Sequence, residues 1–352
     1  MKPEQDEIFM RRCFELAVKG LGLTKTNPVV GCVIVHRGKI IGEGYHHEFG
    51  GPHAEVNAIR SVKNKELLKD STLYCSLEPC SHYGKTPPCS LLIRQSGIPR
   101  VVVANLDPNP QVSGAGLSQL REAGVEVKTQ VLEEEGFHLN RRFFTYHTLK
   151  RPYVILKWAR SRDGYIDLLR NPGDPVGPNW ITEDVARTLV HKWRAEEAAV
   201  MVGTDTVLND NPQLNVRRWT GRNPVRITID RKGRIRDGLH ILDGSLDTII
   251  FSCLTDIYPG EVRALPIDPA YHLRDILGEM YNQHLISVMV EGGARLLNSF
   301  ISTGLWDEAR IFTGKVLFRN GVVSPFLDLE PEKEVDFMGN RLSVYRNPDR
   351  RI

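Results

Sequence analysis

The sequence predicts an α/β protein built from two domains. Its 352 residues exceed what one ordinary hydrophobic core supports, so two domains are expected. Segments with the two-residue period of strands alternate with segments of helical period through both halves, which is typical of α/β folds. The pattern is interrupted near His147–Pro152, a polar stretch that ends in a proline. We therefore place the domains at residues 1–150 and 151–352.

The first domain is expected to begin with a helix. Residues 8–20 have apolar positions at helical spacing and end at Gly20, a residue type that commonly terminates helices. Residues 31–45 indicate two strands joined by a tight turn at Arg37-Gly38. The remaining predicted elements of this domain are a helix at 53–62, strands at 73–77 and 100–107, a helix at 117–124 and a strand within 126–131.

The alternation restarts in the second domain with a strand at 153–159. The stretch Leu168–Asn179 contains several proline and glycine turn pairs, which predict a loop. We expect little added structure in the last residues, 340–352. The other predicted elements are a helix at 183–196 and strands at 198–203, 225–230, 247–252, 285–290 and 308–314.

The composition is that of a soluble globular protein, with 41% hydrophobic and 25% charged residues. The formal net charge of +3 and the lack of any cluster of five or more lysines and arginines argue against a nucleic-acid partner. No apolar run reaches the length of a membrane span, and the polar first residues lack the apolar core of a signal peptide. Six cysteines in so long a chain do not form a disulfide framework, so we expect a reducing, cytoplasmic location.

One histidine and two cysteines have the spacing of a zinc site. His53 is followed two residues later by Glu55, and Cys80 and Cys89 come after the strand at 73–77. Three nitrogen and sulfur ligands leave the fourth position of a tetrahedral zinc ion to water, as a catalytic site requires. Glu55 is then suited to move protons between water and substrate. This is the pattern of zinc deaminases, in which H-x-E precedes P-C and a second cysteine.

The two cysteines are separated by eight residues, where nucleoside and nucleic-acid deaminases usually have two. The longer segment holds His82 and Lys85 between Gly84 and Pro87-Pro88, and we expect such a loop to grip a substrate phosphate. The competing interpretations are a closed structural zinc site with a fourth ligand elsewhere, or two cysteines that merely pack. The presence of both H-x-E and P-C favours the catalytic interpretation.

A second candidate site follows the strand at 285–290. The second domain has no G-x-G-x-x-G after a strand, so a Rossmann-type cofactor site is not supported. Instead, Glu291-Gly292-Gly293 leads into a helix that begins near Ala294. Glycines at such a junction let a phosphate approach the backbone N–H groups of the helix. Taken alone, the junction is more often a plain packing turn.

Together these motifs resemble the bifunctional riboflavin-biosynthesis deaminase/reductases, and the resemblance covers nearly the whole chain. It implies a cytidine-deaminase-like α/β/α sandwich followed by a dihydrofolate-reductase-like α/β domain. The implied reactions are zinc-dependent hydrolytic deamination of 2,5-diamino-6-(5-phosphoribosylamino)pyrimidin-4(3H)-one and NADPH reduction of 5-amino-6-(5-phosphoribosylamino)uracil. The motifs that carry the resemblance are NPVVGCVIV (27–35), GGPHAEVNAI (50–59), EPCSHYGKTPPC (78–89) and DPNPQVSGAG (107–116).

The resemblance also implies roles for individual residues. One zinc ion per chain would be held by His53, Cys80 and Cys89, with Glu55 as the catalytic group. The deaminase substrate would be positioned by Asn27, His46, His82, Lys85, Asp107 and Asn109. NADPH would lie against Ala159, Trp180, Thr206, Asp210, Gly293 and Ala294. The reductase substrate would be held by Lys157, Arg194, Leu214, Arg217 and Glu291.

The second domain departs from the family pattern in three places. Tyr165 stands where lysine is common, Pro178 replaces a small polar residue, and the loop after Leu168 is longer than usual. A monofunctional deaminase with a degenerate reductase domain is therefore the alternative. An RNA or nucleoside deaminase would need a basic surface and short cysteine spacing, and a zinc-stabilised binding protein would have no use for Glu55. We also expect a homo-oligomer that acts on small molecules and binds neither nucleic acid nor membrane.

Overall fold

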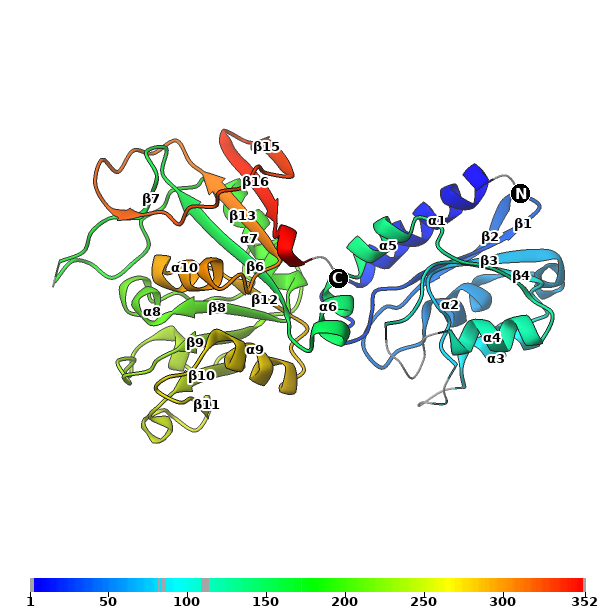
Figure 1. Ribbon diagram of the computed structural model, residues 1–352, viewed down its shortest axis with the longest axis horizontal. Coiled ribbons are helices and arrows are strands. Elements are labelled where there is room, and N and C mark those ends of the chain that lie inside the picture. Colours follow the sequence, from blue (N-terminus) through cyan, green and yellow to red (C-terminus); the bar gives the residue numbers. More distant parts are fainter. Residues whose placement is uncertain (1–2, 82, 84–86, 109–113, 172, 351–352) are drawn as a thin grey trace. The chain divides into compact units, whose positions relative to one another are not determined.

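The computed structural model describes residues 3–81, 83, 87–108, 114–171 and 173–350. The chain separates into two compact units, Met1–Leu149 and Lys150–Ile352, and each is described by itself (Figure 1). Both units are α/β, as the sequence predicts.

The first unit is built on a five-stranded sheet in the order β2-β1-β3-β4-β5. The strand β1 is antiparallel to both β2 and β3, whereas β3, β4 and β5 are parallel. The strands are β1 (Gly31–His36), β2 (Lys39–Tyr45), β3 (Ser71–Leu77), β4 (Arg100–Asn105) and β5 (Glu126–Lys128). The helices are α1 (Pro3–Ala17), α2 (Ala54–Ser61), α3 (Cys89–Gln95), α4 (Ala115–Glu122), α5 (Glu133–Leu139) and α6 (Arg141–Leu149), with 3₁₀ turns at Val18–Gly20 and Lys65–Asp70.

Helices cover both faces of this sheet and form a three-layer sandwich (Figure 1). Because side chains alternate along a strand, Val33 and Val35 pack towards α1 while Cys32 and Ile34 pack towards α2. The helices α1 and α5 lie on the first face, and α2, α3 and α4 lie on the second. Helix α2 approaches the sheet so closely that a Cβ atom at Gly44 would lie 2.3 Å from the backbone nitrogen of Ala58. This close packing fixes where α2 begins.

The second unit is built on a nine-stranded sheet in the order β11-β10-β9-β8-β12-β6-β13-β16-β15. The strands from β11 to β13 in this order are parallel, and the last two are antiparallel. The strands are β6 (Tyr153–Arg160), β8 (Ala199–Gly203), β9 (Val225–Ile229), β10 (Thr248–Ser252), β11 (Arg263–Pro266), β12 (Ser287–Val290), β13 (Glu308–Thr313), β15 (Lys333–Phe337) and β16 (Asn340–Arg346). A separate pair is formed by β7 (Tyr165–Asp167) and β14 (Val322–Val323).

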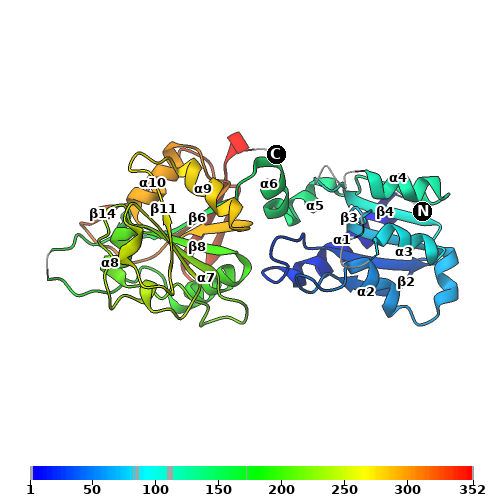
Figure 2. The ribbon, with the colours of Figure 1, turned by 90° about the horizontal axis from the view of Figure 1, so that it is seen from below.

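Helices lie on both faces of the larger sheet as well (Figure 2). The side chains Ile155 and Met289 pack with Val190 and Trp193 of α7, whereas Val154 and other alternate residues pack with α9 and α10. Figure 2 shows α7 on one side of β6 and β8, and α9 and α10 on the other. The helices are α7 (Asp184–Glu196), α8 (Thr204–Asp210), α9 (Leu273–Asn282) and α10 (Ala294–Ser302), with 3₁₀ turns at His240–Leu242, Thr255–Ile257 and Pro348–Arg350.

One expectation from the sequence is wrong. Residues 340–352 were expected to add little structure, but β16 pairs with β13 and extends the sheet, and β15 pairs with β16 in turn. At the predicted domain boundary, α6 continues into the polar stretch at 147–152 and ends at Leu149. The helix is held by Phe143, Phe144 and Tyr146, which are buried.

Candidate active sites

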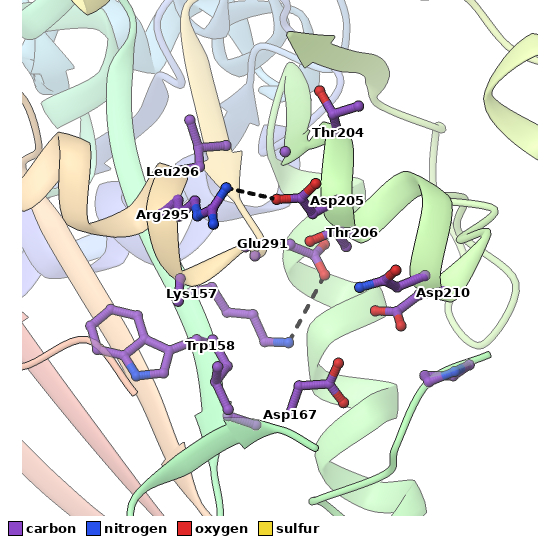
Figure 3. Close-up of a pocket in the computed structure, with 18 of the residues that line it drawn as sticks. Lys157, Trp158, Asp167, Thr204, Asp205, Thr206, Asp210, Glu291, Arg295 and Leu296 are labelled. Atoms are coloured by element: carbon purple, nitrogen blue, oxygen red, sulfur yellow. Dashed lines mark ion pairs between the residues drawn. The ribbon is translucent and has the colours of Figure 1, made fainter. Parts of the chain in front are cut away.

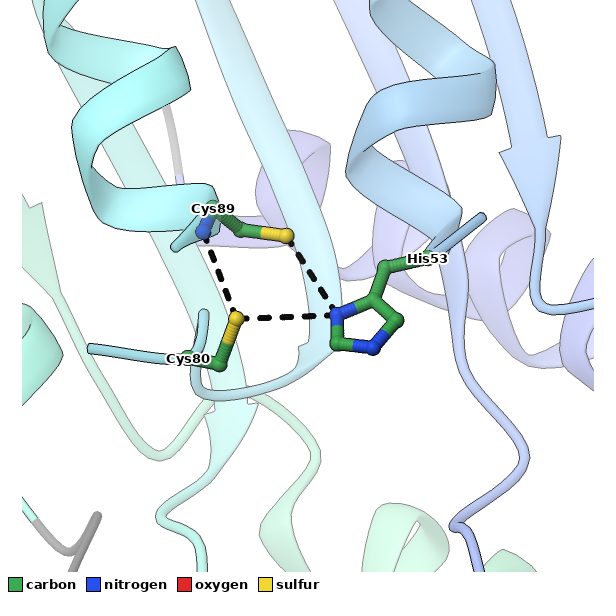
Figure 4. Close-up of side chains that lie close together, drawn as sticks. All are labelled: His53, Cys80 and Cys89. Carbon is green, nitrogen blue, oxygen red and sulfur yellow. Dashed lines mark hydrogen bonds between the residues drawn. The ribbon is translucent and has the colours of Figure 1, made fainter. Parts of the chain in front are cut away.

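Three side chains of the first unit meet at the end of β3 (Figure 4). His53 immediately precedes α2, Cys80 follows β3, and Cys89 is the first residue of α3. The Nδ1 atom of His53 lies 3.6 Å from Sγ of Cys80 and 3.4 Å from Sγ of Cys89. Within the described ranges, this is the one group of potential metal ligands whose ligand atoms gather within 4.8 Å of one another. The local geometry thus joins residues that are 36 positions apart.

The spacing of these atoms fits zinc. Zinc bonds of about 2.1 Å to nitrogen and 2.3 Å to sulfur, at a tetrahedral angle, place the two ligand atoms about 3.6 Å apart. The backbone N–H of Cys89 donates to Sγ of Cys80 over 3.3 Å, and hydrogen bonds from the Cys89 thiol and the His53 ring lower the pKa of Cys80. Thiolate is the form that binds metal. The histidine and the two cysteines can therefore hold one zinc ion.

Glu55 lies beside this cluster in the first turn of α2 and is only 3% exposed. Burial raises the pKa of its carboxyl group, and the nearby His53 opposes the shift. A carboxyl group with a raised pKa can both accept and return a proton near neutral pH. The position and the environment of Glu55 thus suit acid–base chemistry next to a metal ion held by His53, Cys80 and Cys89.

A histidine orients one predicted substrate contact, Asn27. The Nδ1 atom of His46 is 3.1 Å from the carbonyl oxygen of Pro52, which can only accept a hydrogen bond, so this nitrogen carries the proton. Burial lowers the pKa of His46, which favours the neutral ring. Its Nε2 then accepts from the amide nitrogen of Asn27 over 3.2 Å. The carbonyl end of the Asn27 amide is therefore the end that remains for a ligand.

Glu78 has a structural role that the sequence analysis missed. It is 4% exposed, and its carboxylate accepts backbone N–H groups from Gly114 at 2.9 Å, Gly116 at 3.1 Å, and Asp107 and Leu117 at 3.4 Å. These donors lie in the loop after β4 and at the start of α4. The signal that could have indicated this role is a glutamate directly after a wholly buried strand.

The remaining predicted deaminase contacts are only partly described. Asp107 is half-buried in the loop that Glu78 holds. His82, Lys85 and Asn109 lie outside the described residues. Tyr83 is 74% exposed.

A cavity of about 1030 Å³ opens in the second unit (Figure 3). It lies where β8, β9 and β12 end, at the carboxyl edge of a parallel sheet, which is where α/β proteins commonly bind ligands. Ten of the eleven residues predicted for the reductase site line it. They are Lys157, Ala159, Trp180, Arg194, Thr206, Asp210, Arg217, Glu291, Gly293 and Ala294, with Pro178 also in the wall.

A buried ion-pair cluster forms one wall of the cavity. Arg194 donates to both carboxylate oxygens of Glu291, at 2.5 and 2.8 Å, and Nζ of Lys157 lies 3.9 Å from the same carboxylate. Burial alone would raise the pKa of Glu291, but Arg194 and Lys157 lower it. Burial also lowers the pKa of Lys157. Figure 3 shows Lys157 and Glu291 pointing towards one another from β6 and from the end of β12.

Asp210 occupies a second charged position in the wall. Burial, with repulsion from Asp167, raises its pKa to about 6, although Arg170 donates to its carboxylate over 2.9 Å. Arg170 belongs to the long loop predicted at Leu168–Asn179, and it also binds Asp167. The loop that departs from the family pattern therefore reaches into this site.

The glycine junction opens directly to the cavity. Gly293 has a φ of 81°, and a Cβ atom there would lie 3.3 Å from Oγ1 of Thr206. A side chain at this position would be strained and would crowd Thr206. The backbone surface between β8 and α10 thus stays bare, which suits a ligand that approaches backbone N–H groups.

Leu214 is the predicted reductase residue whose side chain does not line the cavity. It is 2% exposed and packs with Val200, Val202 and Val207 in a core cluster. Only its backbone could face a ligand. Trp180 is instead half exposed in the cavity, with the Arg187 guanidinium 4.2 Å from its ring centre. Tyr165 lies in β7, which pairs with β14.

Two family models match the chain, one in each unit. The model of the cytidine and deoxycytidylate deaminase zinc-binding region matches residues 3–105, and that of the RibD C-terminal domain matches residues 152–330. The riboflavin biosynthesis protein RibD of Aquifex aeolicus is 40% identical over 97% of this chain and 98% of its own length. The chain belongs to the RibD family.

Other RibD proteins give the same result. The RibD protein of Escherichia coli is 36% identical over 88% of this chain and 87% of its own length. A solved deaminase/reductase from Thermotoga maritima has a TM-score of 0.88, with 39% identity over 99% of this chain and 100% of that one. A structure of Acinetobacter baumannii RibD has a TM-score of 0.86, with 33% identity over 98% and 99% of the two chains.

Membership of the RibD family confirms the predicted fold class and the bifunctional interpretation. The chain is an enzyme of riboflavin biosynthesis with a zinc-binding deaminase domain and a reductase domain. The alternative of a monofunctional deaminase is not favoured, because the reductase family model matches the second unit as well. In the part of the chain that the structure describes, no helix is both long and apolar enough to cross a membrane.

Proposed function

We propose that the first unit deaminates 2,5-diamino-6-(5-phosphoribosylamino)pyrimidin-4(3H)-one and that the second unit reduces the resulting 5-amino-6-(5-phosphoribosylamino)uracil with NADPH. The solved relative from Thermotoga maritima is described as the deaminase and reductase of these compounds. The observation that carries the proposal is the cluster of His53, Cys80 and Cys89 with buried Glu55 beside it. The lined cavity of the second unit supports the reductase part.

In the deaminase reaction, Glu55 moves the protons. One zinc ion per chain, held by the histidine and the two cysteines, would supply a Lewis acid that makes water a better nucleophile. The Glu55 carboxylate takes a proton from the attacking water as its oxygen bonds to the ring carbon that bears the amino group. The protonated Glu55 then gives this proton to the amino nitrogen, the C–N bond breaks, and ammonia leaves. Asn27 and Asp107, with His82, Lys85 and Asn109, would position the substrate.

In the reductase reaction, the side chains of the cavity bind and orient. NADPH, when bound, supplies a hydride to C1 of the ring-opened ribosylamine. The bare backbone at Gly293 and the side chains of Thr206 and Asp210 would hold the cofactor, while Lys157 and Glu291 would face the sugar. Burial and the neighbouring arginines, first Arg194, lower the pKa of Arg217. A phosphate dianion would relieve this repulsion, because arginine binds phosphate through paired N–H donors.

The test is a two-step assay on the purified full chain with the diaminopyrimidine phosphate and NADPH. We expect ammonia release in the first step and NADPH oxidation in the second. A Cys89→Ser variant should lose zinc and ammonia release, yet still oxidise NADPH when the deaminated compound is supplied. Undiminished zinc in this variant would remove Cys89 from the ligand set. A wild-type chain that oxidises no NADPH on the deaminated compound would overturn the reductase assignment.

We also propose a cellular location and an oligomeric state for the enzyme. All six cysteines lie in the described residues and none forms a disulfide, which supports a reducing, cytoplasmic location. We also propose that the protein is a homo-oligomer. Sedimentation of the zinc-loaded chain at several concentrations would show whether it is a monomer instead.

A further inference from the structure

A buried histidine in the wall of the reductase cavity has no role assigned to it above. His191 lies in α7, is 4% exposed and forms part of the cavity lining. Arg194 follows one helical turn later, and residues three positions apart on a helix lie on the same side. The sequence signal is this spacing inside the helix predicted at 183–196. His191 and Arg194 therefore face the same neighbours.

The ring of His191 accepts a hydrogen bond from the main chain of Arg217. The backbone nitrogen of Arg217 lies 3.3 Å from Nδ1 of the histidine. A backbone N–H group can only donate, so Nδ1 carries no proton and the proton of the neutral ring lies on Nε2. Burial, followed by the charges of Arg194 and Arg217, lowers the pKa of His191 to about 4. The ring is therefore neutral near pH 7 and remains an acceptor.

The segment Leu214–Arg217, which we call the Arg217 loop, is held at three points. Leu214 has a φ of 54°, a conformation that side chains rarely adopt, and its burial in the core fixes that end of the loop. The backbone N–H of Val216 donates to the side-chain oxygen of Asn223 over 2.7 Å. The third point is His191, which binds the N–H of Arg217 at the other end.

Arg194 extends this contact between α7 and the Arg217 loop. Its Nη1 donates to the carbonyl oxygen of Asn215 over 3.1 Å, while its other nitrogens bind Glu291. Nη1 of Arg217 in turn donates to the side-chain oxygen of Asn215 over 2.8 Å. Both arginines line the cavity, and Arg194 lowers the pKa of Arg217. Two cations held together against their repulsion suit an anionic group of the substrate.

We propose that His191 is a positioning residue of the reductase: by accepting the N–H of Arg217, it fixes the guanidinium group of that arginine for the phosphate of the substrate. The inference rests on the proposed phosphate contact of Arg194 and Arg217, and adds the residue that holds one of them in place. His191 acts through Arg217 and takes no part in hydride transfer. Its loss should therefore weaken binding of the substrate and spare the chemical step.

The experiment compares two substitutions of nearly equal shape. In His191→Asn the side-chain oxygen is bonded to Cγ, as Nδ1 is in histidine, so an acceptor stays near Arg217, whereas His191→Leu has a methyl group there. NADPH oxidation on the deaminated compound would be measured with the full zinc-loaded chain. We expect His191→Leu to raise KM for this compound roughly tenfold, with kcat and KM for NADPH changed by less than about twofold. His191→Asn should stay within about threefold of the wild type.

A second measurement connects the effect to the phosphate. On the dephosphorylated form of the same compound, His191→Leu should have the kcat/KM of the wild type, because Arg217 then has no phosphate to bind. In an Arg217→Ala background, His191→Leu should add less than about a twofold loss, because the guanidinium group that it positions is gone. The control is Lys192→Gln, the next residue of α7, whose side chain pairs with Glu196 and does not line the cavity. Melting temperatures and ammonia release would verify that each variant is folded.

The outcomes separate this inference from the proposed function. An unchanged KM in His191→Leu, equal losses in the leucine and asparagine variants, or equal losses with and without the phosphate would each overturn the positioning role. If the leucine variant does not fold, His191→Gln gives the same test, because its amide reaches the place of Nε2 and leaves that of Nδ1 without an acceptor. A wild-type chain that oxidises no NADPH on the deaminated compound would overturn the proposed reduction, and the inference with it.

Discussion

Glu55 is held in the first turn of α2, where burial raises the pKa of its carboxyl group. We expect Glu55→Gln to keep its zinc and its fold but to release ammonia about a hundredfold more slowly, or worse, because an amide cannot accept the proton of water. The matched control is Glu15→Gln, which alters an exposed carboxylate of α1. Metal analysis and an ammonia-release assay on Glu55→Gln and on Glu15→Gln test this expectation. Release at the wild-type rate would exclude Glu55 from the mechanism.

Asp210 links stability to pH at the second site. Its pKa is raised from 3.8 to about 6, so its contribution to stability is fully present below about pH 4 and is lost as the pH rises through 6. We expect Asp210→Asn to stabilise the second unit by about 1–2 kcal/mol at pH 8 and to make no difference at pH 4. The same variant should bind NADP⁺ more weakly and deaminate normally. Thermal melts across this pH range, with cofactor titration, test the expectation.

Individual residues differ in how far the sequence reveals them. His53, Cys80 and Cys89 are predictable because their residue types, their order and the H-x-E and P-C motifs around them match the pattern of zinc deaminases. Glu78 was missed because its four N–H partners come from a segment at least 29 positions further along the chain. Leu214 shows a different limit, since a role taken from a family pattern does not indicate that its side chain packs in a core cluster.

At the scale of elements, α1 is attached to the sheet of the first unit by one buried carboxylate. Asp6 accepts two hydrogen bonds from Arg100 and one each from Lys128 and Tyr74. Burial alone would raise the pKa of Asp6, but these partners hold it well below its usual range. The ionised group therefore stabilises the unit above about pH 4, and the contribution is lost as the pH falls further.

We expect Asp6→Asn to destabilise the first unit by about 2–4 kcal/mol at pH 7, because it leaves Arg100 without its buried counterion. The difference in the free energy of unfolding between Asp6→Asn and the wild type should become smaller at acidic pH, where Asp6 begins to be protonated. The control Glu126→Gln removes only the exposed partner of Arg100 and should cost less than about 1 kcal/mol. Urea unfolding at pH 7 and pH 3 would measure both. Equal losses for the two variants would contradict the role given to Asp6.

The predictability of an element depends on how much of it is buried. The strands β3 and β12 have every residue buried, and the mostly apolar segments 73–77 and 285–290 were recognised as strands. The strand β15 has no buried residue, so its sequence, KEVDF, carries little of the apolar signal that marks a strand. It is held by backbone pairing with β16, which the sequence does not display. Such pairing depends on distant partners, and periodicity cannot indicate it.

At the scale of the whole molecule, each unit has its own core and its own candidate site. We expect a fragment of residues 1–150 to bind zinc and release ammonia, and a fragment of residues 151–352 to oxidise NADPH on the deaminated compound. Zinc chelation should lower the melting temperature of the first fragment alone. Calorimetry and the two assays on separate fragments test this. If the first fragment were folded and zinc-loaded but released no ammonia, the first unit would need the second unit for its activity.

The carboxylate of Glu78 also bears on which substitutions count as conservative. Four backbone donors converge on its two oxygens, so an exchange for glutamine would turn one acceptor into a donor that meets other donors. We expect Glu78→Gln to be nearly as damaging as Glu78→Ala: ammonia release should fall at least tenfold while zinc remains bound. Glutamine has nearly the shape of glutamate, but its amide NH₂ group cannot accept the hydrogen bonds that the second carboxylate oxygen accepts. The backbone N–H groups of Asp107, Gly114, Gly116 and Leu117 meet only acceptors at Glu78, and charge-preserving Glu78→Asp is the variant that should retain part of the activity.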